Sequence, residues 1–262
     1  MSAPTISFED GAVYEQMMGK WSGLIGNAFI DWLSPPPNLR WIDIGCGNGA
    51  FTQLLTERCA PESIEGVDPS EGQLAFARER LATPVTRFRQ GDAMALPYPN
   101  DTFDAAVMAL VVFFIPEPSR GVAEMARVVR PGGLAAAYIW DLVSGGGPSE
   151  AVITQMRDMG SAPPRAPRAE ASTPEGLLAL WTQAGFAEIQ ARVIGTRRTF
   201  DDFEDYWSTT VAAPNIAPKL ATMTPAEVSQ LKSRVSEQVP IEANGRVTIE
   251  ARANAIVGRR PE

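Results

Sequence analysis

The chain has 262 residues, of which 45% are hydrophobic and 21% are charged, a composition typical of a globular protein with one sizeable core. Lys and Arg number 23 against 31 Asp and Glu, which gives a net charge of −8. A surface that repels phosphate argues against a nucleic-acid partner. Two cysteines exclude a disulfide framework, and the absence of histidine removes the commonest general base and metal ligand.

The N-terminal stretch MSAPTISFED lacks the charged-then-apolar pattern of a signal peptide. The longest apolar run, AAVMALVVFFI at 105–115, is too short to span a bilayer. We therefore expect a cytoplasmic protein with no membrane partner. Residues 10–33 are expected to form an amphipathic helical stretch, which SPPPN at 34–38 separates from the following strand.

Between residues 40 and 141, short apolar strands alternate with helical stretches. Strands are expected at 40–45, 63–68, 85–92, 103–111 and 134–141, and helices at 51–59, from the capping box of Ser70 and Gln73 to Leu81, and at 117–130. The helix at 117–130 is expected to stop at Pro131-Gly132-Gly133. This alternation favours an α/β fold with a doubly wound, mostly parallel sheet.

The C-terminal part continues in a similar way after a proline-rich segment at 160–173. A helix is expected from Thr173-Pro174 to Ala184, strands at 187–200 and 247–260, and a helical region at 201–240 between them. We expect a single domain over 1–262. Its cofactor-binding core is 40–141, and 10–33 and 201–240 form a helical cover, the latter as a lid.

The stretch WIDIGCGNGAF at 41–51 carries glycine at three alternate positions, Gly45, Gly47 and Gly49. It satisfies G-x-G-x-G and also G-x-G-x-x-A, the dinucleotide-binding form. In both uses the glycines let a ligand approach the backbone, while the following helix offers free N–H groups at its N-terminus. Asp68 ends the second strand, where it can accept hydrogen bonds from ribose hydroxyls. The loop alone leaves a dinucleotide, another nucleoside ligand and a plain tight turn open.

Three further features separate these possibilities. Asp43 stands two residues before the first glycine, where a carboxylate repels a pyrophosphate but attracts an ammonium group. Asp92 follows the third strand, where it can accept from an adenine amino group. The chain also lacks histidine and a Tyr-x-x-x-Lys pair, the usual tools of hydride transfer. Together they favour a ligand with adenosine, ammonium and carboxylate groups, as in S-adenosylmethionine.

Four motifs in order strengthen this interpretation: WIDIGCGNGAFT (41–52), GVDPSEGQLAFARER (66–80), GDAMALPYPNDTFDAAVMALVVFFIPEP (91–118) and EMARVVRPGG (124–133). On them, the chain resembles the class I S-adenosylmethionine-dependent methyltransferases, in the small-molecule branch that includes ubiquinone and menaquinone biosynthesis enzymes. The resemblance implies a Rossmann-like, seven-stranded sheet, S-adenosylmethionine as cofactor with S-adenosylhomocysteine as product, no metal, and a small-molecule methyl acceptor.

The resemblance also implies a set of cofactor contacts. They are Tyr14, Lys20, Asp43, Gly45, Cys46, Gly47, Gly49, Asp68, Pro69, Ser70, Asp92, Ala93, Met94, Leu110 and Val111. The glycines would shape the loop under the methionine moiety and Asp43 would lie near its amino group. Asp68 would bind the ribose and Asp92 the adenine amino group, while Lys20 would close on the carboxylate with Tyr14 stacking nearby. Pro69 and Ser70 could equally serve only as a helix cap, and Lys20 could be an ordinary solvated side chain.

The reacting groups are less defined. Family members often carry histidine after the fourth strand, where this chain has Phe113-Phe114. Asp141, at the end of the fifth strand, is the best candidate base, although a carboxylate there could simply cap the following loop. The expected substrate pocket comprises Phe114, Trp140, Tyr206 and Trp207, the last two from an aromatic stretch at 199–214 that could instead be a buried helix face.

Other functions remain open at this stage. A protein or nucleic-acid methyltransferase is disfavoured by the acidic surface, and an NAD-type oxidoreductase rests only on the G-x-G-x-x-A overlap. A catalytically silent cofactor-binding protein also fits, since fold does not settle function. We expect a monomer or homodimer, and the identity of the acceptor is not encoded in any motif.

Overall fold

A seven-stranded sheet forms the centre of the molecule, whose computed structural model describes residues 19–164 and 166–262. The strands are β1 (Arg40–Ile44), β2 (Ser63–Asp68), β3 (Thr86–Gln90), β4 (Phe103–Ala109), β5 (Val129–Trp140), β6 (Ala187–Phe200) and β7 (Val247–Arg259). The helices are α2 (Lys20–Leu33), α3 (Ala50–Arg58), α4 (Glu71–Arg80), α5 (Pro118–Val128), α6 (Glu150–Asp158), α7 (Pro174–Gln183), α8 (Phe203–Val211), α9 (Ala217–Leu220) and α10 (Pro225–Gln238), with short 3-10 turns at Val112–Phe114 and Ala169–Ser172.

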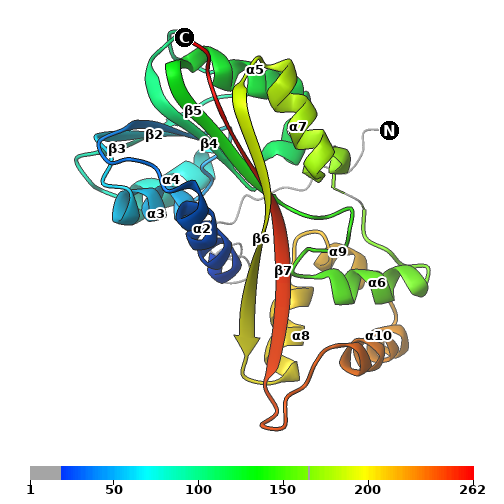
Figure 1. Ribbon diagram of the computed structural model, residues 1–262. Helices are drawn as coiled ribbons and strands as arrows, with labels where there is room; N and C mark the ends of the chain where they lie inside the picture. The colour runs from blue at the N-terminus through cyan, green and yellow to red at the C-terminus, as the bar shows by residue number, and fades with distance from the viewer. Residues whose placement is uncertain (1–18, 165) are drawn as a thin grey trace.

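The strand order is β3-β2-β1-β4-β5-β7-β6 (Figure 1). Neighbouring strands from β3 to β5 are parallel, whereas β7 runs antiparallel to both β5 and β6. The direction of winding reverses between β1 and β4, and open α/β sheets bind ligands at such a switch point, beyond the carboxyl ends of the strands. This is the class I methyltransferase topology and confirms the fold class expected from the sequence.

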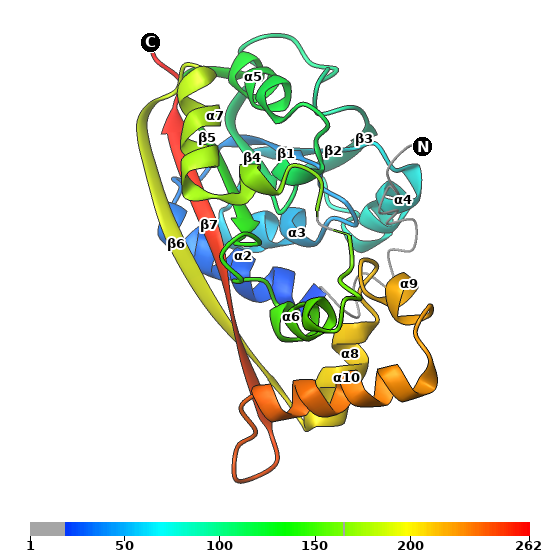
Figure 2. The same ribbon diagram turned by 90° about the vertical axis from the view of Figure 1, so that its right-hand side faces the viewer.

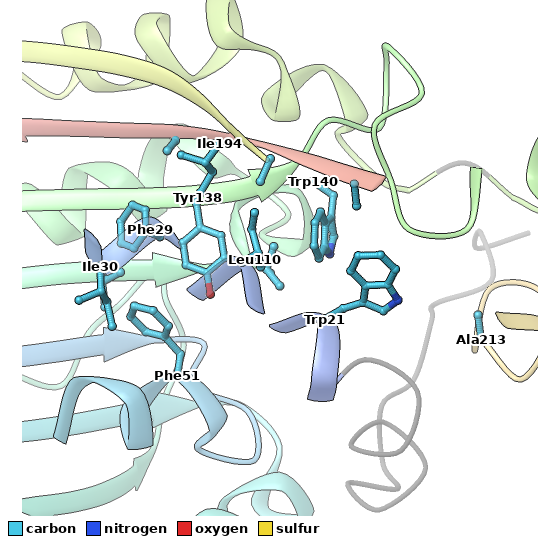
Figure 3. Close-up of a cluster of buried hydrophobic side chains, with 14 of the residues drawn as sticks. Trp21, Phe29, Ile30, Phe51, Leu110, Tyr138, Trp140, Ile194 and Ala213 are labelled. Atoms are coloured by element: carbon cyan, nitrogen blue, oxygen red, sulfur yellow. The ribbon is translucent and has the colours of Figure 1, made fainter. Parts of the chain in front are cut away.

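Helices cover both faces of the sheet because its central strands are apolar on both sides. Along β5, Ala136, Tyr138 and Trp140 contribute to a core shared with α2 and α3, whereas Ala137 and Ile139 contribute to the opposite core, beneath α5 and α7. On the first face, Phe29 of α2 packs 4.6 Å from Tyr138, between ring centroids (Figure 3). The described half of the 10–33 stretch is therefore a packed helix.

The strands β6 and β7 extend beyond the rest of the sheet, and α6, α8, α9 and α10 gather beside this extension (Figures 1 and 2). Side-chain caps start two of these C-terminal helices. Asp202 accepts from the backbone N–H of Asp205 at the start of α8, and Thr224 and Glu227 form a capping box at the start of α10. No helix within the described ranges is long and apolar enough to cross a membrane.

Two sequence expectations need correction. Helix α5 ends at Val128, and Pro131-Gly132-Gly133 do not end it but form a bulge inside β5. Gly132 adopts a φ of +73° there, and its N–H donates to the carbonyl of Arg260 at 2.9 Å. Helix α6, with Val152 and Met156 buried on one face, was not predicted and lies between β5 and the proline-rich segment.

Candidate functional site

The glycine loop connects β1 to α3 at the switch point of the sheet. Backbone N–H groups of Gly45 and Cys46 both donate to the carbonyl of Val67 in β2, at 2.7 and 3.1 Å. Gly45, Gly47 and Gly49 all adopt positive φ, +73°, +52° and +80°, a region that costs residues with a Cβ about 1–2 kcal/mol. The expected glycine-dependent turn is present, and it is tied to the neighbouring strand.

The three glycines have different surroundings. A Cβ at Gly45 would lie 2.6 Å from methyl groups of Val111, and one at Gly49 would lie 3.1 Å from Ala77. A Cβ at Gly47 would meet no atom nearer than 3.9 Å. Gly45 and Gly49 are therefore required by packing, whereas Gly47 borders open space in which a ligand can approach the backbone.

Asp43 lies directly beneath this loop, in β1, and is fully buried. Its Oδ2 accepts a 2.6 Å hydrogen bond from the hydroxyl of Thr52 in the first turn of α3, while its Oδ1 is buried and has no hydrogen-bond partner among residues 19–164 and 166–262. Burial raises the pKa of Asp43 to about 7, and the nearby carboxylate of Asp68 acts in the same direction. A buried carboxylate oxygen with no donor is costly unless a ligand supplies one.

Asp68 ends β2 and reaches back to the glycine loop. Its Oδ2 accepts from the N–H of Gly47 and its Oδ1 from the N–H of Ser70, both at 2.9 Å. Burial raises the pKa of this carboxyl, partly offset by the two backbone donors. Each ionised oxygen can accept more than one hydrogen bond, so Asp68 can still receive ribose hydroxyls while it braces the loop.

The residues expected beside the adenine lie at the start of α4 and in the segment that follows β3. The side chain of Ser70 caps α4 by accepting from the N–H of Gln73 at 3.3 Å, as the helix-cap interpretation of this residue expects. Asp92 is exposed and accepts from the N–H of Met94 at 2.8 Å, while Ala93 is half-buried. The preceding Gly91 donates to the carbonyl of Asp68 at 3.1 Å, which holds this segment beside the ribose-side carboxylate.

Leu110 and Val111 follow β4 at the switch point. Leu110 has a φ of +62°, an uncommon conformation for a residue with a branched side chain, and its N–H donates to the carbonyl of Tyr138 at 2.8 Å. Strained residues of this kind concentrate at ligand sites. Val111 contacts the Gly45 position, so the end of β4 and the glycine loop form one continuous floor.

Cys46 is buried in the loop, and burial raises the pKa of its thiol well above the ordinary value. A thiol with a raised pKa is a poor nucleophile. The structure therefore gives Cys46 the surroundings of a small packing residue within the cofactor loop.

The end of β5 carries the remaining candidates. Trp140 is buried, its indole packs edge-on against Trp21 of α2 at 6.3 Å between ring centroids (Figure 3), and its Nε1 has no hydrogen-bond partner. Asp141 accepts from the N–H of Ser144 at 3.2 Å and lies 3.8 Å from the guanidinium of Arg252. The structure thus places Asp141 in a loop cap and an ion pair.

The other candidates for the substrate pocket differ in burial and lie on different elements. Phe114 is partly exposed beyond β4 and packs on Phe113. Tyr206 and Trp207 of α8 are buried in the same core as Trp140, and burial raises the pKa of Tyr206 to about 12. The alternative interpretation of 199–214, a buried aromatic helix face, describes these two side chains. Lys20 is exposed at the start of α2, and Tyr14 lies outside the described residues.

Sequence reasoning missed three residues that the structure connects to the site. Thr52 hydrogen-bonds the Asp43 carboxylate, and its position in the first turn after the glycines could have indicated it. Glu124 and Arg127, within the EMARVVRPGG motif, hydrogen-bond the segment that follows β3. A Glu–Arg pair three residues apart on a predicted helix is a weak signal, because most such pairs are only surface pairs.

These residues fit a ligand with an ammonium group and a ribose. The unpartnered Oδ1 of Asp43 suits a cationic donor, Asp68 suits vicinal hydroxyls, and open space lies above Gly47. Within the described ranges, no three Cys, Asp or Glu side chains are grouped to hold a metal ion.

Comparisons with known proteins agree with this geometry. Residues 42–137 match a family described as "Methyltransferase domain". The chain is 42% identical over 97 residues to 2-methyl-6-phytyl-1,4-hydroquinone methyltransferase 2, chloroplastic, of Oryza sativa subsp. japonica, a match that covers 37% of this chain and 28% of the rice protein. It is 42% identical over 98 residues to phosphatidylethanolamine N-methyltransferase of Cereibacter sphaeroides, covering 36% of this chain and 47% of that protein.

The likeness to these curated relatives thus spans less than half of their length. Among solved structures, the fold resembles Haemonchus contortus phosphoethanolamine N-methyltransferase 2 in complex with S-adenosyl-L-methionine, with a TM-score of 0.61 at 16% identity, covering all of this chain (100%) and 61% of that one. Residues 42–137 are therefore similar to a methyltransferase domain, and the fold of the chain is that of the class I S-adenosylmethionine-dependent methyltransferases.

Proposed function

We propose that the protein transfers a methyl group from S-adenosylmethionine to a small-molecule acceptor. The observation that supports this proposal is the fully buried carboxylate of Asp43, two residues before the glycine loop, whose Oδ1 has no donor in the part of the chain that the structure describes. A cationic amino group would satisfy it, whereas a pyrophosphate would be repelled. The same observation disfavours the NAD-type alternative.

The proposed cofactor contacts follow the strand ends. Asp43 holds the amino group, the glycine loop with Cys46 lies under the methionine moiety, and Asp68 binds the ribose. Pro69, Ser70, Asp92, Ala93 and Met94 surround the adenine, and Leu110 and Val111 form the floor. Lys20, at the exposed start of α2, and Tyr14 remain predictions for the carboxylate end.

When bound, the cofactor supplies an already activated methyl group, so the protein's task is to align the acceptor and exclude water. Trp140 and Trp21 support this proposal with an apolar aromatic wall beside the end of β5. We propose that Phe114, Tyr206 and Trp207 extend that wall, and that α2 and the 201–240 region cover the site. The relatives' names identify a hydroquinone and a phosphatidylethanolamine acceptor for those enzymes, and both compound classes are suitable first acceptors to try here.

Asp141 is the proposed proton acceptor where the methyl acceptor carries a proton. Asp141→Asn keeps an oxygen that can accept from Ser144 but removes the basic carboxylate. If Asp141 serves as the base, turnover falls by about 10²-fold or more while the affinity for S-adenosylhomocysteine is retained. Retained turnover would assign Asp141 to the loop cap alone.

Calorimetric titration tests the cofactor proposal directly. We expect saturable binding of S-adenosylhomocysteine and no binding of NAD. Binding of NAD without a response to S-adenosylhomocysteine would refute it. We further propose a cytoplasmic enzyme that acts as a monomer or homodimer without a nucleic-acid partner, which fractionation and light scattering would check.

A further inference from the structure

The segment between β3 and β4 (residues 91–102) contains Asp92, Ala93 and Met94, the proposed adenine contacts, yet it forms no helix and no strand. Its first residue is tied to β2 through the Gly91 N–H and the Asp68 carbonyl. Further along, Glu65 of β2 accepts from the Tyr98 hydroxyl at 3.0 Å and Arg89 of β3 donates to the carbonyl of Pro97 at 3.1 Å. Contacts to the backbone of Met94, Leu96 and Tyr98 come from α5.

Two side chains of α5 hold the middle of this segment. Glu124 Oε2 accepts from the N–H of Leu96 at 2.8 Å. Arg127 donates from Nη2 to the carbonyl of Leu96 at 3.1 Å and from Nη1 to the carbonyl of Tyr98 at 2.8 Å. The carbonyl of Leu96 also accepts from the Tyr98 N–H at 2.8 Å within the segment. For the N–H of Leu96 and the carbonyl of Tyr98, Glu124 and Arg127 supply partners from outside it.

Glu124 and Arg127 also fix each other. The guanidinium donates from Nε to Oε1 and from Nη2 to Oε2 of Glu124, both at 2.7 Å, in a two-pronged pair. Their side chains are only 19% and 30% exposed, and the guanidinium holds the pKa of Glu124 below its usual range. A bidentate, partly shielded pair of this kind is a more rigid anchor than a single surface contact.

The anchor is itself fixed to the sheet. Val122, Met125 and Val128 on the inner face of α5 are fully buried in the core beneath the sheet. Arg120, one turn earlier, adds a 3.0 Å hydrogen bond from Nε to the carbonyl of Met94. Contacts therefore connect the buried core through α5 to the 91–102 segment.

We propose that Glu124 and Arg127 are positioning residues for the adenine end of the cofactor. The inference rests on the proposed function. Without them, the middle of the segment would lose these partners, and the stretch that carries Asp92 and Met94 would be less ordered before a ligand binds. Neither residue touches the ligand in this account; both act through the backbone of Leu96 and Tyr98.

The test compares two ligands that differ only at the edge of the purine that carries the adenine amino group. S-adenosylhomocysteine has an amino group at C6 and an unprotonated N1, whereas S-inosylhomocysteine has a carbonyl at C6 and a proton on N1. Calorimetry measures both dissociation constants for the wild-type protein, Arg127→Ala and Glu124→Gln, below each variant's melting temperature. Arg197→Ala is the matched control, because Arg197 forms an exposed ion pair with Glu250 between β6 and β7, away from the segment.

We expect Arg127→Ala to weaken S-adenosylhomocysteine binding by about tenfold but S-inosylhomocysteine binding by much less, since coupled contacts are not additive. Glu124→Gln, which keeps an oxygen for Leu96, should show a smaller loss in the same direction, and it carries the test if Arg127→Ala does not fold. Arg197→Ala should leave both constants unchanged.

Equal weakening of both ligands would show a merely structural role and overturn the inference, as would unchanged binding of S-adenosylhomocysteine. A wild-type protein that binds neither ligand would overturn the proposed function, and the inference with it. Failure of the inference alone would leave wild-type binding intact.

Discussion

The hydroxyl of Thr52 in α3 donates a 2.6 Å hydrogen bond to Oδ2 of Asp43 in β1, whereas Oδ1 of the same carboxylate is buried and receives no donor from any described residue. The fold thus supplies a donor to Oδ2, and Oδ1 is available to accept a hydrogen bond from a ligand. This asymmetry leads to a prediction about pH.

Asp43 should couple stability and cofactor affinity to pH in opposite directions. Because burial raises its pKa to about 7, the folded state binds the proton more tightly than the unfolded chain. The free energy of unfolding should therefore fall as the pH rises from about 4 to 7, by up to about 4 kcal/mol from this group. Affinity for the ammonium-bearing S-adenosylhomocysteine should rise through the same range.

Asp43→Asn provides the control, since its side-chain oxygen can still accept from Thr52. Urea unfolding and calorimetry at several pH values would check both slopes. Parallel pH profiles for the wild-type protein and Asp43→Asn would contradict the assignment.

Asp68→Ala should weaken S-adenosylhomocysteine binding by about 1.5–3 kcal/mol, the usual scale for hydrogen bonds to a charged group. It also removes the acceptor for the Gly47 and Ser70 N–H groups, so a modest loss of stability is expected with it. Asp68→Asn, which retains one carbonyl oxygen, should fall between. A variant that melts much earlier and yet binds the ligand normally would make Asp68 purely structural.

Gly47→Ala and Gly45→Ala should distinguish a glycine that leaves room for a ligand from a glycine that is required by packing. The first places a methyl group where nothing lies within 3.9 Å, so it should cost only about 1–2 kcal/mol of stability for its positive φ and mainly reduce S-adenosylhomocysteine affinity. The second drives a methyl group into Val111 and should lower the melting temperature more. The reverse order of melting temperatures would be inconsistent with this loop geometry.

Trp207→Ala should destabilise the fold by about 3–5 kcal/mol, as for other large-to-small changes at buried aromatic residues. Trp207 is 6% exposed and stacks on Phe203 at 6.4 Å between ring centroids. Chemical denaturation would measure the change, with Trp207→Phe as the milder control. Unchanged stability combined with lost acceptor turnover would instead support a substrate-gripping role for the α8 aromatics.

Sequence patterns predicted most of the fold because their signals are local. The ranges of β2 and β6 agree residue for residue with the expectation, and α7 begins at the Thr173 cap as expected. The prediction that Pro131-Gly132-Gly133 ends a helix was wrong because it used only the local sequence. Gly132 and Gly133 continue β5 by pairing with Arg260, which lies far along the chain. No residue near Gly132 in the sequence indicates that Arg260 is its partner.

The candidate site shows the same division. The carboxylates at strand ends, Asp43 and Asp68, were found because strand and turn patterns locate them in the sequence. The hydroxyl of Thr52 against Asp43, and the contact of Trp21 with Trp140, depend on how helices dock on the sheet. Such contacts depend on packing between segments distant in sequence, which periodicity does not reveal.

The placement of β7 between β5 and β6 has a consequence for biosynthesis. Strands β1 to β5 can join one another as they emerge from the ribosome, but β6 pairs only with β7, which is made after three further helices. Until then β5 keeps an open edge and the fourteen residues of β6 have no partner, a state prone to mispairing between chains. Because pairings as distant as Leu134 with Arg259 must close last, the insertion of β7 should be the slow step in folding.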